Sequence, residues 1–219
     1  MAGLLRRAAA FPYQLGKHVE RRRIQERRLR AAGVFFSRQP RPLKLNLGCG
    51  DAPLQTWVNV DLFQPEKADV LWDLTEPLPL EAGACSFIYH EHVLEHFSID
   101  EGLKLLRECR RLLHPSGVLR VGMPGIDHFV TCYIKNEWHE PEWDALPEVA
   151  AIKTRAEMLN AIMRFWGHQH LYDAEELFRR LREAGFTTMQ QVEWGKSAHA
   201  ELRNLETRRL TTLVCEASA

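Results

Sequence analysis

The chain has 219 residues, of which 45% are hydrophobic and 26% are charged. This length is enough for one domain with a buried core, and the composition excludes disordered and fibrous proteins. The five cysteines are widely spaced and form no Cys-x-x-Cys pair, which argues against a disulfide framework or a zinc ribbon and favours a reducing, cytoplasmic location. No apolar run reaches the length of a membrane span.

The charges are unevenly distributed although the net charge is zero. Residues 1–42 hold eleven Lys or Arg and two Asp or Glu, so a basic N-terminal helical arm precedes an acidic main domain, residues 43–219. We expect the arm to contact the acidic domain. Two alternatives stay open, namely weak peripheral contact with an acidic membrane surface and an organelle transit peptide, which the Arg- and Ala-rich start resembles. Nucleic acid is not an expected partner, and no feature predicts an oligomeric state.

The residue pattern predicts short strands that alternate with helices. A charged helix is expected over 13–32, ending at Gly33, and Pro40 and Pro42 then block its continuation. His114–Gly117 is expected to form a turn. The predicted strands are 43–47, 57–62, 70–72, 86–89, 118–123, 187–194 and 210–215.

Two capping boxes mark helix starts, Ser98 with Glu101 and Asp173 with Glu176, and Gly185 stands where a left-handed C-cap belongs. A further helix is expected over 155–164. The alternation predicts an α/β fold, a Rossmann-like doubly wound sheet that is mostly parallel. Residues 126–172 loosen into aromatic and proline-containing sequence, which indicates an insertion over one end of the sheet.

Polar residues collect where the predicted strands end, and parallel sheets bind ligands at that edge. Gly48 and Gly50 would let the backbone approach a ligand closely, with free N–H groups for an anion. Asp61 and Asp73 could accept hydrogen bonds from ribose hydroxyls and an adenine amino group. The third glycine of a dinucleotide motif is absent and Asp61 follows Gly50 too closely, so NAD is a minor alternative.

Linked motifs over residues 43–125 resemble those of the class I S-adenosylmethionine-dependent methyltransferases, and more narrowly their type 11 branch. The motifs are Leu45–Gly50 (first motif), Val60–Leu62 (ribose-binding acid), Asp73-Leu74 (adenine contact), Ser86–Phe97 (fourth-strand motif) and Leu112–Gly117 (a Leu-Lys-Pro-Gly-Gly-like turn). The resemblance implies about seven strands with the last one antiparallel, and S-adenosyl-L-methionine as the cofactor. It implies cofactor contacts from Leu47, Gly48, Cys49, Gly50, Asp61, Leu62, Asp73, Leu74 and His90.

One departure from the family concerns the connection after the glycine turn. The family usually places a full helix before the second strand, whereas only Asp51–Thr56 is available here. We expect the basic helix over 13–32 to cover the face that this leaves exposed.

The resemblance implies methyl transfer to a small-molecule or saccharide-like acceptor, with O-methylation expected. A hydroxyl acceptor loses its proton as the new bond forms, and the candidate bases Glu91, His92 and His96 stand at the end of the fourth strand. A second polar and aromatic cluster supplies candidate acceptor contacts, which are Trp166, His168, His170 and Tyr172.

Other interpretations stay open. The chain could be a non-catalytic S-adenosylmethionine-binding regulatory or scaffold protein. His92-Val93-Leu94-Glu95-His96 also matches the H-x-x-E-H pattern of zinc hydrolases, but that pattern lies inside a helix and this segment follows a strand directly. We therefore expect no metal. Glu95 and His96 could also merely cap or orient a helix start.

Overall fold

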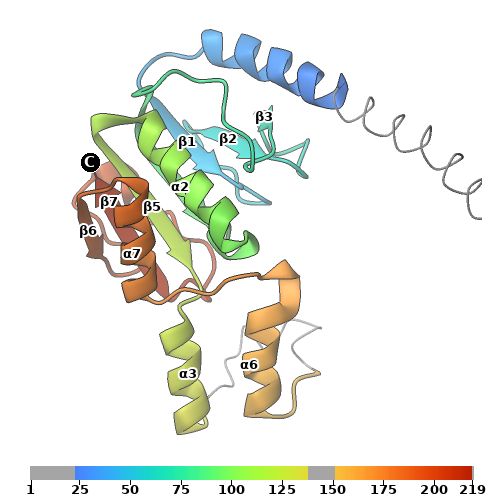
Figure 1. Cartoon of the computed structure of the whole chain (residues 1–219), viewed down its shortest axis with the longest axis vertical. Helices are drawn as coiled ribbons and strands as arrows, with labels where there is room; N and C mark the ends of the chain where they lie inside the picture. Colours follow the sequence, from blue (N-terminus) through green and yellow to red (C-terminus); the bar gives the residue numbers. More distant parts are fainter. Residues whose placement is uncertain (1–22, 138–150, 219) are drawn as a thin grey trace, which may run out of the picture.

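The computed structural model describes residues 23–137 and 151–218 (Figure 1). Its strands are β1 (Leu43–Leu47), β2 (Val58–Asp61), β3 (Val70–Leu71), β4 (Cys85–Glu91), β5 (Leu113–Met123), β6 (Thr188–Gln191) and β7 (Leu213–Ser218). They form one sheet in the order β3-β2-β1-β4-β5-β7-β6. β7 runs antiparallel to β5 and β6, and the remaining neighbours are parallel. The predicted Rossmann-like sheet with an antiparallel last strand is confirmed.

The helices are an N-terminal helix over residues 23–37, α2 (Ile99–Leu112), α3 (Ile126–Lys135), α6 (Arg155–Arg164) and α7 (Ala174–Ala184), with 3-10 turns η1 (Leu94–His96), η2 (Phe165–Gly167) and η3 (Ala200–Leu202). The helices do not alternate regularly with the strands, because β1 to β4 follow one another without a helix and α3, α6 and α7 all lie between β5 and β6. None of the helices in the described ranges is long and apolar enough to cross a membrane.

Local capping signals define the start of α2 and both ends of α7. At the start of α2, Ser98 and Glu101 form the predicted reciprocal capping box. At the start of α7, Asp173 accepts a hydrogen bond from the Glu176 N–H. The Glu176 carboxylate pairs with two arginines of the same helix instead of completing the box. Gly185 ends α7 in the left-handed conformation, as predicted.

Several predicted boundaries are wrong. β6 ends at Gln191 instead of residue 194, and β7 spans Leu213–Ser218 instead of 210–215. The two largest errors lie in the N-terminal helix and in β5. The N-terminal helix continues through Gly33 to residue 37, because Ala32 and Phe36 are buried in the main core and their packing outweighs the helix cost of one glycine, about 1 kcal/mol. Residues 114–117, predicted as a turn before the fifth strand, belong to β5 and bulge out of its ladder with β4. Residues 13–22 of the predicted basic helix lie outside the described residues.

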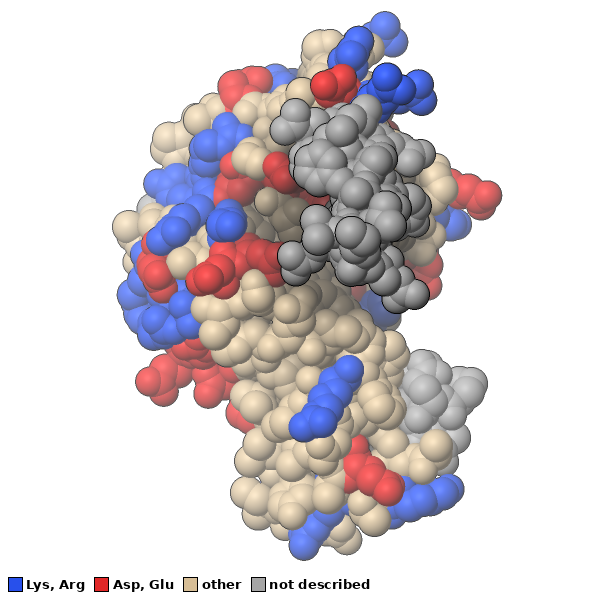
Figure 2. All heavy atoms as spheres, turned by 45° about the vertical axis from the view of Figure 1, so that its right-hand side comes forward, with Lys and Arg blue, Asp and Glu red and all other residues tan. Residues whose placement is uncertain are grey.

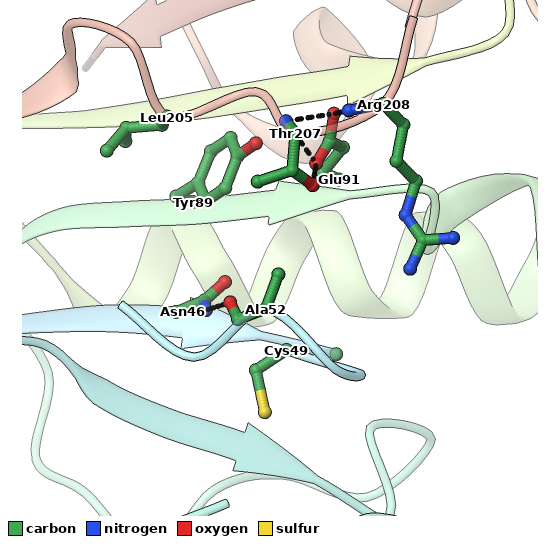
Figure 3. A pocket seen from close by; sticks show the side chains of 9 residues that line it. Asn46, Cys49, Ala52, Tyr89, Glu91, Leu205, Thr207 and Arg208 are labelled. Carbon is green, nitrogen blue, oxygen red and sulfur yellow. Dashed lines mark hydrogen bonds between the residues drawn. The ribbon is translucent and has the colours of Figure 1, made fainter. Parts of the chain in front are cut away.

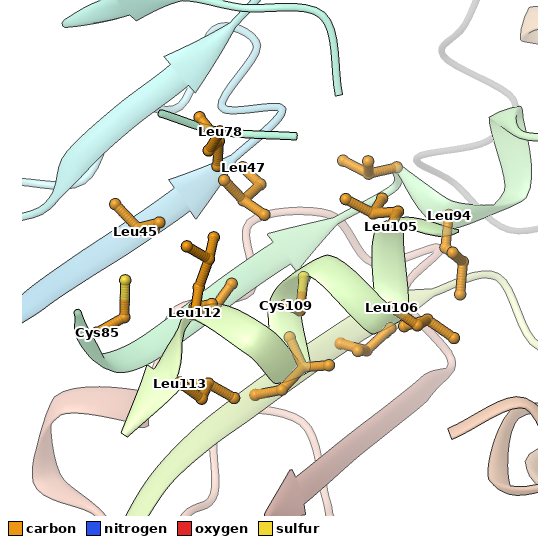
Figure 4. Close-up of a cluster of buried hydrophobic side chains, with 14 of the residues drawn as sticks. Leu45, Leu47, Leu78, Cys85, Leu94, Leu105, Leu106, Cys109, Leu112 and Leu113 are labelled. Atoms are coloured by element: carbon orange, nitrogen blue, oxygen red, sulfur yellow. The ribbon is translucent and has the colours of Figure 1, made fainter. Parts of the chain in front are cut away.

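The main core lies between the sheet and the layer of α2 and α7 (Figures 1 and 4). Leu45 and Leu47 of β1 point into it, opposite Leu106 and Leu112 of α2. Ala32 and Phe36 join this same core. The described part of the N-terminal helix therefore packs on the α2 side of the sheet.

The opposite face of the sheet has a different cover. Residues 51–57 form turns and no helix, and their Leu54 and Trp57 pack beside Tyr89. Leu202 and Leu205 complete this second cluster. They come from residues 192–212, which join β6 to β7 and which we term the covering segment. The prediction that the basic helix covers this face is therefore wrong for the residues that the structure describes.

Packing of the N-terminal helix should be essential to stability. Phe36→Ala should lower the free energy of unfolding by about 3–5 kcal/mol, because the ring is only 1% exposed and its removal leaves a cavity. Val34→Ala, at a position of the same helix that is 51% exposed, should change it by less than about 0.5 kcal/mol. Urea denaturation of both variants tests this; equal losses would show that the helix is not part of the core.

Candidate functional site

A small cavity lies at the carboxyl ends of β1 and β4, where the strand order reverses and α/β sheets bind ligands (Figure 3). Its volume is about 20 Å³. Three segments line it, the glycine turn with its neighbours, the end of β4 and the covering segment. The lining residues are Asn46, Gly48, Cys49, Ala52, Tyr89, Glu91, Leu205, Thr207 and Arg208.

The glycine turn is closed by hydrogen bonds to β2. Gly48 has a φ of 64°, and a β-carbon there would clash with Val93 Cγ2, so only glycine fits. The N–H groups of Gly48 and Cys49 donate to the Val60 carbonyl at 2.7 and 3.2 Å. The Gly50 N–H donates to Asp61 Oδ2 at 2.9 Å. The prediction that these N–H groups are free for an anion is therefore wrong in this conformation.

Neither of the two predicted nucleoside-binding aspartates lines the cavity; Asp61 lies beside the glycine turn, and Asp73 follows β3. Asp61 is 8% exposed, and its carboxylate also accepts a hydrogen bond from the Phe63 N–H at 2.7 Å. Asp73 is partly exposed and accepts two hydrogen bonds from Thr75. Both carboxylates therefore stabilise local turns here.

The other predicted cofactor contacts are mainly interior. Leu47 belongs to the main core, Leu74 packs against it, and Leu62 is partly buried. Burial raises the pKa of the Cys49 thiol to about 11. His90 is fully buried, which lowers its pKa to about 4, and neither ring nitrogen has a hydrogen-bond partner among the described residues. His90 thus lies inside the protein and not at the cavity.

A buried amide network, which the sequence analysis missed, positions residues 51–57. Asn46 Nδ2 donates to Asn59 Oδ1 at 3.0 Å and to the Ala52 carbonyl at 3.3 Å. The N–H and Nδ2 of Asn59 donate to Asp69 Oδ2 at 2.8 and 3.1 Å. The signal was present, because each asparagine interrupts an apolar strand, Leu-Asn-Leu and Val-Asn-Val.

Glu91, a candidate base at the end of β4, holds the covering segment over the cavity (Figure 3). Its carboxylate accepts hydrogen bonds from the Thr207 N–H at 3.0 Å and hydroxyl at 2.7 Å, and from the Arg208 N–H at 3.1 Å. The Thr211 hydroxyl donates to it at 2.6 Å. Arg208 reaches Asp51 at 3.0 Å beyond the glycine turn. The carboxylate, the turn and the covering segment thus form one closed unit.

A buried ion cluster anchors the covering segment away from the cavity. Arg120 of β5 is 0% exposed and contacts Glu206 and Glu216, each at 2.6 Å. The guanidinium also donates to the Lys196 carbonyl at 2.8 Å, and the Gly195 N–H donates to Glu206 at 2.9 Å. No local sequence pattern indicated this cluster.

The remaining candidate bases, His92 and His96, follow Glu91 in the chain and lie outside the cavity lining. His92 has a φ of 53°, and its Nε2 lies 3.0 Å from the Thr211 hydroxyl. Its Nδ1 lies 3.4 Å from Glu95 Oε1. Burial lowers the pKa of His92 to about 3. His96 packs its ring edge-on against His168, with centroids 5.0 Å apart.

The predicted acceptor contacts do not share one surface. Tyr172 is 1% exposed in the main core, and its burial raises its pKa to about 12. His170 is partly buried, with Nε2 3.5 Å from Glu176. Trp166 is 40% exposed, with a left-handed φ of 58°. Of these four residues, His168 is the one whose ring meets a candidate base.

Removal of one carboxylate from the Arg120 cluster should be costly. Glu206→Ala should lower the free energy of unfolding by about 3–5 kcal/mol, because it leaves part of a buried guanidinium without its counter-charge. Glu201→Ala, at an exposed position of the same segment, should change stability by less than about 0.5 kcal/mol. Thermal and urea denaturation test this; similar stability of both variants would contradict an anchoring role.

Comparison with known proteins adds to this geometry. Residues 45–121 match a family model described as a methyltransferase domain, and no curated protein sequence matches the chain. A S-adenosylmethionine-dependent methyltransferase from Archaeoglobus fulgidus is 15% identical, with 94% of this chain and 99% of that chain covered and a TM-score of 0.50. A S-adenosylmethionine-dependent methyltransferase from Thermotoga maritima, described as a possible histamine N-methyltransferase, is 18% identical over 92% and 96%, with a TM-score of 0.49.

PigF, solved with SAH, is 15% identical, with 82% of this chain covered and a TM-score of 0.48; the chain spans about half of its length, 51%. At 15% identity and a TM-score of 0.50, the similarity to the Archaeoglobus fulgidus structure establishes the fold alone. The family match runs from β1 into β5 and includes the glycine turn, Asp61, Asp73 and Glu91. By this match, residues 45–121 belong to a methyltransferase domain, and the strand order is that of a Rossmann-like fold.

Proposed function

We propose that the protein methylates a small-molecule or saccharide-like acceptor at oxygen, with Glu91 as the base. The observation that carries the proposal is the carboxylate of Glu91 in the lining of the cavity, on the strand end beside the glycine turn. A carboxylate at that place can take the proton that a hydroxyl loses as it attacks.

His92 and His96 are weaker candidates for this role. Burial lowers the pKa of both rings, that of His92 to about 3. Neither histidine lines the cavity, whereas Glu91 does. We therefore assign proton transfer to Glu91 and a supporting position to the two histidines.

The polar groups at the site are of the kinds that could bind S-adenosylmethionine, namely one hydroxyl without a partner among the described residues and two carboxylates. When bound, S-adenosylmethionine supplies an electrophilic methyl group on a sulfonium sulfur. The Tyr89 hydroxyl is buried without a hydrogen-bond partner in the described part of the chain, and it points toward Thr207 and Glu91 across the cavity. Asp61 would bind the ribose and Asp73 the adenine, each by exchanging a local hydrogen bond for one to the ligand.

The covering segment leaves too little space for a nucleoside. A cavity of about 20 Å³ holds roughly one water molecule. We infer that Leu205, Thr207 and Arg208 move outward when the cofactor binds. The hydrogen bonds from Thr207 and Arg208 to Glu91 would then break, which leaves its carboxylate available to the acceptor.

Residues 126–172 are proposed to form the acceptor side. α3 and α6 stand beyond the carboxyl end of β5 and share a small core of their own (Figure 1). Their surface carries few charged side chains in the view of Figure 2. Ile134, Phe165 and Trp166 are 40–70% exposed there. Such a surface favours an acceptor that is largely uncharged.

The cofactor site can be tested at Asp61. Asp61→Asn should weaken S-adenosylmethionine and S-adenosylhomocysteine binding by about 10–100-fold, because a hydrogen bond to a charged group contributes about 1.5–3 kcal/mol. Asp100→Asn, at an exposed position of α2, should bind both normally. Calorimetry gives the affinities and circular dichroism confirms folding. Unchanged affinity in folded Asp61→Asn would refute the assignment.

The proposed base can be tested with Glu91→Gln. S-adenosylhomocysteine release is first measured with a panel of simple sugars and phenols, and the best acceptor is kept. Loss of the base should then lower kcat by about 10²–10⁴-fold, with cofactor affinity nearly unchanged. Glu193→Gln, an exposed position of the covering segment, serves as the control. Normal turnover by Glu91→Gln would exclude Glu91 as the base.

A further inference from the structure

Two segments far apart in the sequence bring together three side chains of the types that bind metals, one carboxylate and two imidazoles. Glu95 and His96 come from η1, directly after β4, and His168 follows η2. One ligand atom from each of the three residues lies within 4.8 Å of the others. The backbone fixes this juxtaposition, because the N–H groups of Gln169 and His170 donate to the Glu95 carbonyl at 2.8 and 3.2 Å. The Gln169 side chain also donates to the His96 carbonyl at 2.7 Å.

Glu95 points to a missing partner at this place. The residue is 0% exposed, and neither side-chain oxygen has a hydrogen-bond partner within the described ranges. His92 Nδ1 approaches Oε1 only to 3.4 Å. A buried carboxylate without partners is costly, and buried charges in proteins are paired or coordinate metals.

His168 is oriented as a metal-binding histidine usually is. Its Nδ1 lies 2.6 Å from the Ile162 carbonyl, and since a carbonyl can only accept, this nitrogen carries the proton and Nε2 keeps its lone pair. Metal-binding histidines typically donate their second N–H to a carbonyl or carboxylate in this way. The ring of His96 packs edge-on against that of His168, with centroids 5.0 Å apart.

We propose that Glu95, His96 and His168 bind one divalent transition-metal ion, of which Zn²⁺ is the reference case. Two imidazoles and one carboxylate suit zinc and its first-row neighbours, and they leave a coordination position open. His92 lies beside Glu95 as a supporting contact. The ion would connect the end of β4 to the acceptor-side residues 126–172.

This site is distinct from the cofactor cavity. None of its three ligands lines the cavity, and the two places communicate through His92, which contacts Glu95 on one side and Thr211 of the covering segment on the other. The site also differs from the hydrolase pattern H-x-x-E-H. His92 is not among the three ligands, and the glutamate itself is one of them.

The test uses the full chain, free of any affinity tag and treated with a chelator. Calorimetry with Zn²⁺ should show one ion per chain, and Co²⁺ should give the visible absorption of a protein-bound ion. Glu95→Gln and His168→Ala should each weaken Zn²⁺ binding by more than about tenfold, since even supporting contacts to a ligand contribute 10–100-fold. The exposed His114→Ala should bind Zn²⁺ like the unaltered protein.

Folding and metal binding are separated by thermal denaturation. Glu95→Gln keeps the volume of the side chain, so the metal-free variant should melt close to the unaltered protein, while the rise in melting temperature on adding Zn²⁺ should be lost. No Zn²⁺ binding by the unaltered chain, or unchanged affinity in Glu95→Gln and His168→Ala, would overturn the proposal. Binding of S-adenosylmethionine is measured separately, so either result leaves the proposed methyl transfer to be judged by its own experiments.

Discussion

Residues 48–57 join β1 to β2 without a helix, so the face of the sheet that carries Asn46 and Tyr89 needs another cover. The covering segment supplies it with Leu202 and Leu205, which bury apolar surface that would otherwise meet water. A segment with few turns of helix must satisfy its polar groups through side chains. The carboxylates of Glu91 and Glu206 do this: Glu91 accepts from the Thr207 N–H, and Glu206 accepts from the Gly195 N–H.

The contacts of Glu206 and of Glu91 hold the covering segment in physically different ways. Glu206 pairs with a fully buried Arg120, and breaking that contact strands a charge in the interior. Glu91 accepts hydrogen bonds from partly exposed groups, whose N–H and O–H can be satisfied by water instead. The cover is therefore expected to loosen first near Glu91. In the function proposed above, this arrangement would let one segment complete the core and still admit a cofactor.

The end of β4 serves two neighbouring sites. Glu91 faces the cofactor cavity, and Glu95, one turn later, faces His96 and His168. His92 stands between them with a left-handed backbone, which turns consecutive side chains to different sides. Residues 91–96 thus contact the covering segment through Glu91 and the proposed acceptor-side residues 126–172 through Glu95.

The sequence by itself determined the strands, the capped helices and the glycine turn, because these signals depend on residues a few positions apart. Ser98 with Glu101 defined the start of α2, and Leu43–Leu47 matched β1 at both ends. Only the tertiary structure decided what surrounds each polar group. Arg120 meets Glu206 and Glu216 across 86 and 96 positions, and the turn N–H groups find partners on β2. His90 and Tyr172, predicted at the site, lie inside because burial is set by elements distant in sequence. No local pattern encodes such contacts.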